Sequence, residues 1–253
     1  MKKIIALTLA LVLALGLIAC GASEGGEAQM TLEEGKLLMS TNAAFPPYEM
    51  TTDDGGYEGI DVEIATAIAK KLGLELEILD MDFDAALLAV NEKKSDIVMA
   101  GVTVNDDRKV VMDFTDSYAQ GVQVIIVKEG STVTDENMGE GKIGAQRGTT
   151  GAIYTTDDFG EDHVTTYDTG ASAVQALLNG QVDCVVIDKA PAEEFVKANP
   201  GLTILETEYA VEDYAIGCDK GNTALVTAIN GALKELIADG TVANIVAKYI
   251  SAE

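Results

Sequence analysis

The sequence has no tryptophan, one histidine and three cysteines among its 253 residues, and these shortages exclude several kinds of site. Zinc sites draw on clusters of cysteine and histidine, and no CxxC pair occurs. Catalysis by a Ser-His or Cys-His arrangement would have to use His163. Cys184 and Cys218 lie in apolar runs typical of buried free thiols, although export would permit a disulfide between them. We therefore expect no metal and no other cofactor.

Basic residues are also few. Seventeen lysines and arginines face 42 aspartates and glutamates, which gives a formal net charge of −25. Nucleic-acid binding is disfavoured, because phosphates need a basic footprint. A strongly acidic surface favours solubility and says little about the fold. The length suits one large domain or two smaller lobes.

The first residues are typical of a bacterial export signal, expected to span 1–19. Lys2 and Lys3 precede an apolar stretch, 4–18, which is shorter than the roughly 20 residues of a membrane-spanning helix. The stretch ends in "LIAC", which is similar to the lipobox of bacterial lipoproteins and predicts a lipid on Cys20. The alternative is an ordinary cleaved signal with an incidental cysteine. With 20–35 as a flexible tether, we expect an exported protein anchored to the outer face of a membrane.

After the tether, strand-like and helix-like segments alternate. In the helical segment 61–73, Ile64, Ile68 and Leu72 share one face, with Asp61 as the expected N-cap and Gly73 as the stop. This alternation predicts parallel sheets covered by helices on both faces. The remaining expected elements are strands 36–41, 74–79, 96–101, 142–146 and 183–188, and helices 84–94 and 171–180.

The two halves of the chain share one plan. Segments 86–101 and 173–188 both run from an alanine-rich helix through a polar turn to an aspartate, Asp96 or Asp183, that opens an apolar strand. We therefore expect two lobes of similar architecture, with the carboxyl ends of their strands facing a shared cleft. The expected bounds are 36–120 with 218–253 for lobe 1, and 121–217 for lobe 2. Segments 121–130 and 212–221 would cross between the lobes as a hinge, and helices 223–240 and 241–250 would pack on lobe 1.

A glycine pattern at 139–144, "GEGKIG", satisfies G-x-G-x-x-G. It precedes a strand, whereas a dinucleotide site requires the glycines to follow one and open a helix. The pattern is discounted.

Six motifs in order carry a resemblance to a known family. Together they cover nearly the whole chain beyond the tether, and they are "TNAAFPPYEM" (41–50), "GIDVEIATAIAKKLG" (59–73), "AGVTVNDDRKVVMDFTDSY" (100–118), "GKIGAQRGTTG" (141–151), "GQVDCVVIDKAPA" (180–192) and "DGTVANIVAKY" (239–249). The chain resembles the type II periplasmic binding proteins of the polar amino acid ABC transporter family.

The resemblance implies an α/β fold of two Rossmann-like lobes joined by two crossing hinge strands. It implies a receptor without enzymatic activity, which closes on a free polar L-amino acid and delivers it to a membrane permease with its ATPase. A monomer is the family expectation. The identity of the amino acid stays open.

The chemistry of the residues supports the same reading for Arg108. A guanidinium matches a carboxylate in bidentate geometry, and Arg108 follows Asn105, the expected N-cap of a helix whose start points free N–H groups at the cleft. Ala100, Gly101 and Thr103 are small enough for backbone groups to approach a ligand. The alternative is that Arg108 pairs with one of the nearby acids, Asp106, Asp107 or Asp113.

The resemblance implies roles for seven more residues. Thr149 and Thr150 would reach the ligand carboxylate, Asp188 would bind its ammonium, Phe45 and Phe83 would sandwich its stem, and Asn42 and Gln146 would line the specificity pocket. Five of them also have a plainer reading: an ordinary glycine-rich turn for Thr149 and Thr150, a helix cap for Asp188, and core packing for Phe45 and Phe83. Many relatives carry an acid where Asn42 stands, which weakens the case for a basic ligand.

Two other functions stay open at this point. Some proteins of this fold resemble periplasmic dehydratases, for which the candidate acids and bases here are Asp188, Glu49 and Tyr118. A sensory module signalling through a membrane partner is the second alternative.

Overall fold

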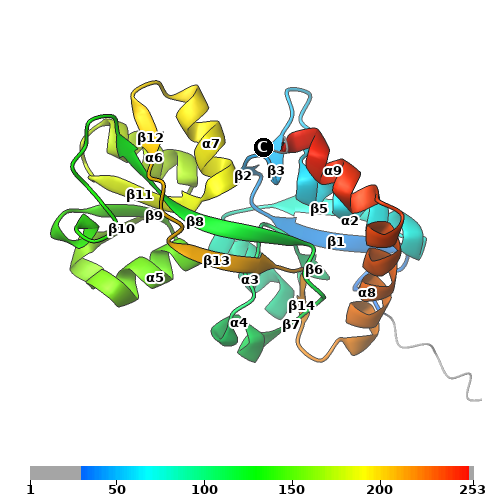
Figure 1. The fold of residues 1–253 in the computed structure, drawn as a ribbon. Helices are drawn as coiled ribbons and strands as arrows, with labels where there is room; N and C mark the ends of the chain where they lie inside the picture. The colour runs from blue at the N-terminus through cyan, green and yellow to red at the C-terminus, as the bar shows by residue number, and fades with distance from the viewer. Residues whose placement is uncertain (1–29, 251–253) are drawn as a thin grey trace, which may run out of the picture.

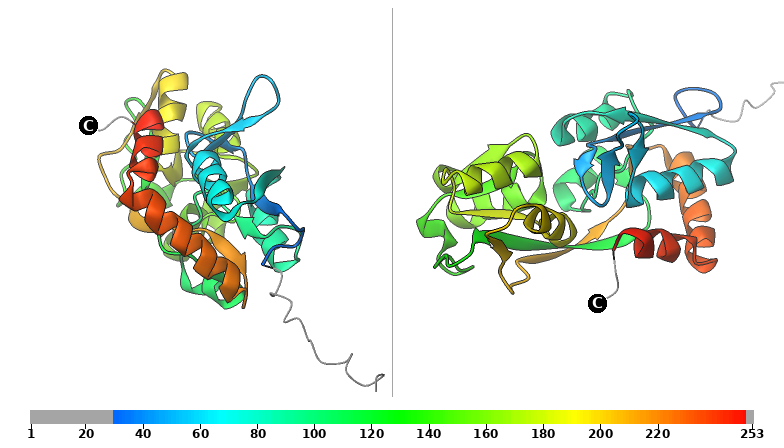
Figure 2. Two further views of the ribbon diagram at one scale, coloured as in Figure 1. Left: turned by 90° about the vertical axis from the view of Figure 1, so that its right-hand side faces the viewer. Right: turned by 90° about the horizontal axis from the view of Figure 1, so that it is seen from above.

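The computed structural model describes residues 30–250 and has two lobes, each built on its own sheet (Figures 1 and 2). This arrangement confirms the predicted α/β architecture of two similar lobes. The expected signal 1–19, Cys20 and the tether as far as residue 29 lie outside the described residues. Within the described part of the chain, no helix combines the length and the apolar character needed to cross a membrane.

The sheet of lobe 1 is mixed, where the sequence predicted a parallel one. Strand β1 is parallel to β5 and β6, but the returning strand β14 is antiparallel to β6 and β7. The returning chain comes from the other lobe and enters this sheet in the opposite direction. The strand order is β5 (Glu75–Asp80), β1 (Lys36–Thr41), β6 (Ile97–Val98), β14 (Gly217–Asp219) and β7 (Met112–Phe114).

Helices and a small three-stranded sheet complete lobe 1. The C-terminal helices α8 and α9 pack on α2, as predicted, and Figure 2 shows them along one side of this lobe. The helices are α2 (Ile60–Leu72), α3 (Phe83–Asn91), α4 (Asp106–Val111), α8 (Thr223–Ala238) and α9 (Thr241–Tyr249); the small sheet has β2 (Ala44–Phe45), β3 (Glu49–Thr51) and β4 (Tyr57–Glu58).

Lobe 2 repeats the plan around a mixed sheet. Strands β10, β9 and β11 are parallel, whereas β8 runs antiparallel to β11 and β12. The strand order is β10 (Val164–Tyr167), β9 (Ile143–Gln146), β11 (Cys184–Asp188), β8 (Ala119–Lys128) and β12 (Leu202–Ile204), with β13 (Ala210–Tyr214) also on β8; the helices are α5 (Thr150–Phe159), α6 (Gly170–Leu178) and α7 (Lys189–Ala198), with 3-10 turns η1 (Met138–Glu140) and η2 (Glu161–His163).

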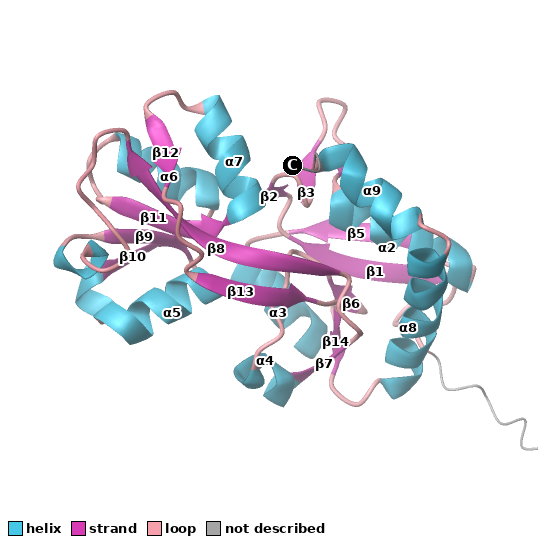
Figure 3. Ribbon diagram, viewed as in Figure 1, coloured by secondary structure: helices cyan, strands magenta, loops and turns pink. Residues whose placement is uncertain are grey.

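Two strands cross between the lobes (Figure 3). Strand β8 is antiparallel to β13, with Ala119 opposite Tyr214 and Gln123 opposite Ala210. The single strand predicted at 212–221 is split in two. Strand β13 ends at Tyr214 in the sheet of lobe 2, and β14 begins at Gly217 in the sheet of lobe 1. The chain therefore changes sheets within two residues, at the base of the cleft.

The start of helix α2 differs from the prediction. Its N-cap is Gly59 and not Asp61, while Gly73 ends the helix in the left-handed conformation, as expected. Gly59 has φ 129°, and a Cβ there would lie 2.2 Å from the Tyr48 carbonyl oxygen, so a residue with a side chain does not fit. The Asp61 carboxylate is instead buried and accepts hydrogen bonds from Gly101 N–H and the Tyr118 hydroxyl.

The strand predicted at 96–101 is also shorter, because β6 covers Ile97–Val98 alone. Gly101 adopts φ 55°, which turns the backbone out of the extended conformation. The turn lies where the strand reaches the cleft.

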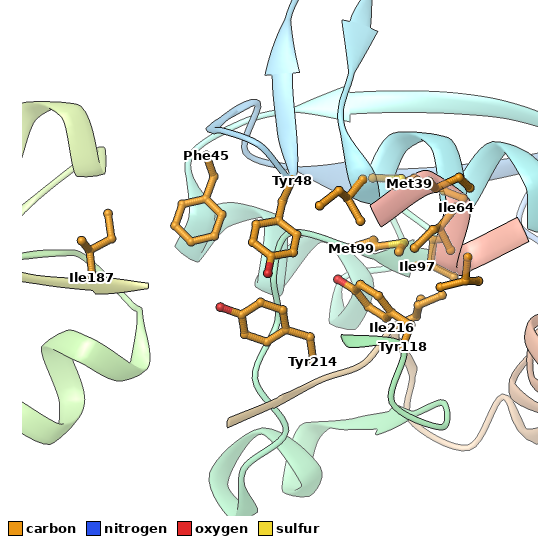
Figure 4. Close-up of a cluster of buried hydrophobic side chains, with 14 of the residues drawn as sticks. Met39, Phe45, Tyr48, Ile64, Ile97, Met99, Tyr118, Ile187, Tyr214 and Ile216 are labelled. Carbon is orange, nitrogen blue, oxygen red and sulfur yellow. The ribbon is translucent and has the colours of Figure 1, made fainter. Parts of the chain in front are cut away.

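Hydrophobic packing holds the cleft edge of lobe 1 in place. In Figure 4 the buried side chains run from Met39, Ile64 and Ile97 to Tyr48 and Phe45 near the other lobe. Phe45, at the edge of the cleft, therefore belongs to a close-packed core, which limits its motion. Cys184 and Cys218 are both buried and free, in agreement with the plainer reading of the two thiols.

The two aspartates that the sequence paired have matching hydrogen bonds. Asp96 accepts from Leu38 N–H at 2.8 Å, and Asp183 accepts from Lys142 N–H at 2.8 Å. Each aspartate N–H also donates back to the carbonyl of the same partner, so each pair closes the start of a strand onto its parallel neighbour. The two lobes thus share a specific contact as well as an outline.

The two contacts differ in burial, which predicts unequal effects on stability. Asp96→Ala should lower the free energy of unfolding by about 2–3 kcal/mol, because it leaves the N–H groups of Leu38 and Leu32 without their carboxylate acceptor. Asp183→Ala, at an exposed position, should cost about 1 kcal/mol or less. Urea unfolding of both variants measures the difference. Equal losses would contradict the assigned role of burial.

Candidate functional site

One cavity lies between the lobes, where the strand ends of both sheets meet. Its walls include all eleven residues that the sequence singled out, together with one more, Glu49. They are Asn42, Phe45, Glu49, Phe83, Ala100, Gly101, Thr103, Arg108, Gln146, Thr149, Thr150 and Asp188. About 20 Å³ of the cavity is open to the centre of a water molecule, which is room for about one water. The lobes are therefore closed on each other.

Arg108 is buried at the floor of this cavity, with 7% of its surface exposed. Its helix starts as predicted, since Asn105 Oδ1 accepts from Arg108 N–H at 2.8 Å. The guanidinium donates to the carbonyl oxygens of Thr103 at 2.8 Å and Gly148 at 3.0 Å. It also lies 5.5 Å from the centre of the Phe83 ring.

The alternative that nearby acids neutralise Arg108 is wrong for two of the three candidates. Asp106 pairs with Lys109, and Asp113 pairs with Lys220. Asp107 is exposed, whereas the guanidinium is buried. Burial lowers the pKa of Arg108 to about 10, so the group keeps its charge at neutral pH. A buried cation held by neutral carbonyl groups is available to an incoming anion.

Two glycines allow the close approach of backbone around Arg108. A Cβ on Gly101 would lie 3.0 Å from the Phe45 ring, and one on Gly148 would lie 3.2 Å from the Asp84 side chain in the facing lobe. Both glycines have positive φ angles, 55° and 77°. A larger residue at either position would push the walls apart.

The lobe 2 side of the cavity is formed by the start of α5. The Thr149 hydroxyl caps this helix at Ala152 N–H and donates to the Gln146 carbonyl at 2.8 Å, so it is already engaged. The Thr150 hydroxyl lies 3.4 Å from that of Thr103 in lobe 1. The free N–H groups of this helix start add a positive potential.

Asp188 is the last residue of β11 and precedes α7, but its side chain makes no capping hydrogen bond. Asp188 therefore holds the N-cap position of α7 without capping the helix through its side chain. The carboxylate instead accepts from Gln123 Nε2 at 2.8 Å and from the Tyr214 hydroxyl. Burial, followed by the charge of Glu212, raises the pKa of Asp188 well above its usual value. A cation at this point would compensate both effects.

Aromatic rings form the sides of the cavity. Phe45 is stacked on Tyr48 at 5.8 Å between ring centres, and Tyr48 meets the edge of Tyr214 at 5.4 Å (Figure 4). Phe83 lies against Arg108. Phe45 and Phe83 also belong to hydrophobic cores, so they both pack the lobe and line the cavity.

Asn42 and Gln146 meet across the cleft. Gln146 Nε2 donates to Asn42 Oδ1 at 2.9 Å and to the Asp168 carbonyl at 3.2 Å, while Asn42 Nδ2 donates to the Met81 carbonyl at 2.9 Å. Each amide is thus largely satisfied by protein groups. The pair closes one end of the cavity with neutral groups.

Glu49 was not predicted as a ligand residue. In the sequence analysis it is one of three candidate general acids or bases for a dehydratase. The pairing of its strand with β2 is what places it in the cavity. Glu49 in β3 stands directly opposite Phe45 in β2, so their side chains share a face. The residue is fully buried. Burial and the charge of Asp61 raise the pKa of Glu49 well above its ordinary value.

The sequence as a whole matches one family. Residues 37–252 match the bacterial extracellular solute-binding proteins, family 3. The chain belongs to this family.

Relatives and solved structures agree. A probable histidine-binding protein of Neisseria gonorrhoeae is 35% identical over 100% of this chain and 97% of its own. The ABC transporter glutamine-binding protein GlnH of Bacillus subtilis is 30% identical over 99% and 98%. The structure of an ancestral arginine-binding protein bound to glutamine has a TM-score of 0.82 at 37% identity, over 87% of this chain and 100% of that one. These relatives are binding proteins, and this chain is one as well, not an enzyme.

The buried acids near the cavity predict how the stability of the protein depends on pH. Burial raises the pKa of Asp61 to about 6 and that of Glu49 well above its usual value. Above about pH 4, where such groups ionise in an unfolded chain, the folded protein therefore holds more protons than the unfolded one. The free energy of unfolding should fall as the pH rises through about 4 to 6, and further where Glu49 ionises.

Thermal unfolding of the ligand-free protein between pH 4.5 and 8, in the same ionic strength throughout, measures this slope. Glu49→Gln should flatten the decline in Tm, and Glu58→Gln, an exposed neighbour on the same small sheet, should not. A Tm that rises over this range, or equal slopes in the two variants, would contradict the assignment.

Proposed function

We propose that the protein is the extracytoplasmic receptor of an ABC importer and that it closes its two lobes on a free amino acid. One observation carries the proposal, namely that a buried guanidinium and a buried carboxylate from different lobes line one small cavity. An amino acid has the complementary pair of charges at its α-carbon. Arg108 would bind the carboxylate and Asp188 the ammonium.

The remaining walls fit the same ligand. The N–H groups at the start of α5 would face the carboxylate, and Thr103 and Thr150 place hydroxyls at the cavity from opposite lobes. Phe45 and Phe83 would hold the stem of the side chain between apolar faces. The relatives named above are described as binding histidine, glutamine or arginine, which share the α-carboxylate and α-ammonium.

Closure is a hinge motion about β8 and the β13–β14 connection. Among the contacts that join the lobes, three lie at the cavity and would have to break for a ligand to enter. They are Arg108 with Gly148, Asn42 with Gln146, and Thr103 with Thr150. Because the two crossing segments are the covalent links, rotation about them opens the cavity without unfolding either sheet. A hinge at these segments supports the domain bounds given above, in which the lobes meet near residues 120 and 217.

Delivery requires a membrane partner. The protein would present the closed lobes to a permease with its ATPase. The relative GlnH is named as a component of an ABC transporter. We infer that the chain is a monomer held at the cell membrane by a lipid on Cys20.

The decisive variant removes the guanidinium. Arg108→Ala should weaken amino acid binding at least about tenfold, because a buried charged hydrogen-bond partner contributes about 1.5–3 kcal/mol. Arg147 is a matched control, since its side chain is exposed and paired with Asp168. A dye-based thermal-shift screen of the twenty amino acids identifies the ligand first, because a bound ligand raises Tm by mass action. Calorimetry then compares the two variants. Unchanged affinity in Arg108→Ala would overturn the proposal.

The anchor has its own test. Cells supplied with a labelled fatty acid should incorporate the label into the protein, and Cys20→Ser should abolish the label and release the protein from the membrane fraction. Cys184→Ser is the control, since that thiol is buried in lobe 2. Membrane association that survives Cys20→Ser would contradict a lipid anchor at this residue.

A further inference from the structure

Tyr214 is fully buried at the base of the cleft, and the proposed function gives it no task. It is the last residue of β13, one of the two strands that cross between the lobes. Its hydroxyl donates a hydrogen bond to Asp188 Oδ1, on the acid to which the ligand ammonium is assigned. The other oxygen, Asp188 Oδ2, accepts from Gln123 Nε2 at 2.8 Å. Each oxygen of Asp188 therefore has one donor from the protein.

The backbone of Tyr214 is tied to lobe 1, although β13 belongs to the sheet of lobe 2. The Tyr214 carbonyl accepts from Tyr118 N–H at 3.0 Å. On its other edge the segment 213–215 pairs with 102–104 of lobe 1 through backbone hydrogen bonds of 3.0 and 3.1 Å. Hydrogen bonds on both sides therefore hold Tyr214 in place relative to lobe 1.

The ring of Tyr214 is packed against lobe 1 as well. It meets Tyr48 edge to face at 5.4 Å between ring centres, and it lies close to Gly101, where a Cβ would be 3.5 Å from the ring. In Figure 4 the ring lies next to Tyr48, and its hydroxyl points toward the lobe that carries Ile187, the residue before Asp188. The side chain therefore extends from lobe 1 across the hinge to lobe 2.

A glycine leaves the space through which the hydroxyl reaches Asp188. Tyr214 is opposite Ala119 on β8, and Asp188 is opposite Gln123 on the same strand. Gly121 lies between these two positions and on the same face of the strand, because side chains alternate. A Cβ on Gly121 would lie 2.3 Å from the Tyr214 hydroxyl oxygen. Only a residue without a side chain therefore admits this contact.

The two donors of Asp188 respond differently to a rotation of the lobes. Gln123 pairs with Asp188 within the sheet of lobe 2, so it stays beside the carboxylate in any arrangement of the lobes. Tyr214 is held by lobe 1, so its hydrogen bond to Asp188 depends on the angle between the lobes. A carboxylate with a donor on each oxygen is fixed in orientation, whereas one with a single donor can rotate. Closure therefore completes the support of Asp188.

We propose that Tyr214 is the positioning residue of the ammonium site, and that it fixes the Asp188 carboxylate for an α-ammonium when the lobes close. This inference rests on the proposed function and names the residue that couples closure to recognition of the ammonium. Tyr214 does not belong to the described residues that line the cavity, so it acts through Asp188 and not by touching the amino acid.

Tyr214→Phe tests the hydroxyl, because phenylalanine keeps the packed ring. Calorimetry on the whole protein should show about tenfold weaker binding, the effect of one hydrogen bond to a charged group. The probes are those of the twenty amino acids that raise the Tm of the wild-type protein. The loss should be similar for each of them, because all carry the α-ammonium. The Tm of the ligand-free variant checks that it is folded.

Tyr209→Phe is the matched control. Its hydroxyl also donates to an aspartate, Asp158, but both residues belong to lobe 2 and neither lines the cavity. This variant should bind every probe as the wild-type protein does.

The pH dependence of binding is a readout that a purely structural role for Tyr214 would not change. Asp188 must be ionised to bind an ammonium, and a hydroxyl donor favours the ionised carboxylate. Its loss raises the pKa of Asp188, so the pH at which affinity is half lost on acidification should rise by about one unit in Tyr214→Phe. The other groups whose charge acts on Asp188 are the same in both proteins, namely Glu212, Arg108, Glu49, Tyr48 and Tyr154.

The outcomes separate this inference from the proposed function. Unchanged affinity in Tyr214→Phe, an unshifted pH midpoint, or an equal loss in Tyr209→Phe would overturn the role of Tyr214 and leave amino acid binding intact. If no amino acid binds the wild-type protein, the proposed function falls and this inference falls with it.

Discussion

A single buried cation, the guanidinium of Arg108, organises the interior of the closed protein. It is held by the carbonyl oxygens of Thr103 in lobe 1 and Gly148 in lobe 2, so it joins the lobes, and the charges of Glu212 and Asp188 also act on it. Carbonyl dipoles offset part of the lost hydration of a cation, and a carboxylate would offset more. The closed cleft therefore favours an anion at this point more strongly than bulk water does. Asp106 on the same helix and Asp113 on the strand that follows it are paired with lysines and not with this guanidinium.

The repeated architecture explains why the cation and its opposing acid meet. In lobe 1 the buried Asp96 ties the start of one strand to its parallel neighbour, and in lobe 2 the exposed Asp183 does the same. The carboxyl ends of these strands point to the cleft. Arg108 follows β6, and Asp188 ends β11, the matching strand of the other lobe. Similar strand ends thus deliver unlike charges to one cavity, which is the requirement for recognising a zwitterion.

Much of this arrangement could be predicted from the sequence, because the strongest signals are local. The apolar run before Asp188 and the N-cap Asn105 each specify a strand or helix end within a few residues, and the eleven predicted residues do line one cavity. The errors arose where distant contacts decide. Asp61 has the chemistry of an N-cap, but its carboxylate is taken by Gly101 and Tyr118, and the steric limit at Gly59 sets the helix start. Strand β14 is antiparallel to its neighbours because its chain returns from the other lobe. No local sequence pattern predicts that return.

Glu49 shows the same limit from the functional side. In the sequence it is one of 42 acids, and its surroundings are set by Asp61, Asp80 and Asp188 on other elements. A closed cleft that gathers these acids around one another is less stable than one with apolar residues there, since each buried carboxyl must either stay protonated or remain uncompensated.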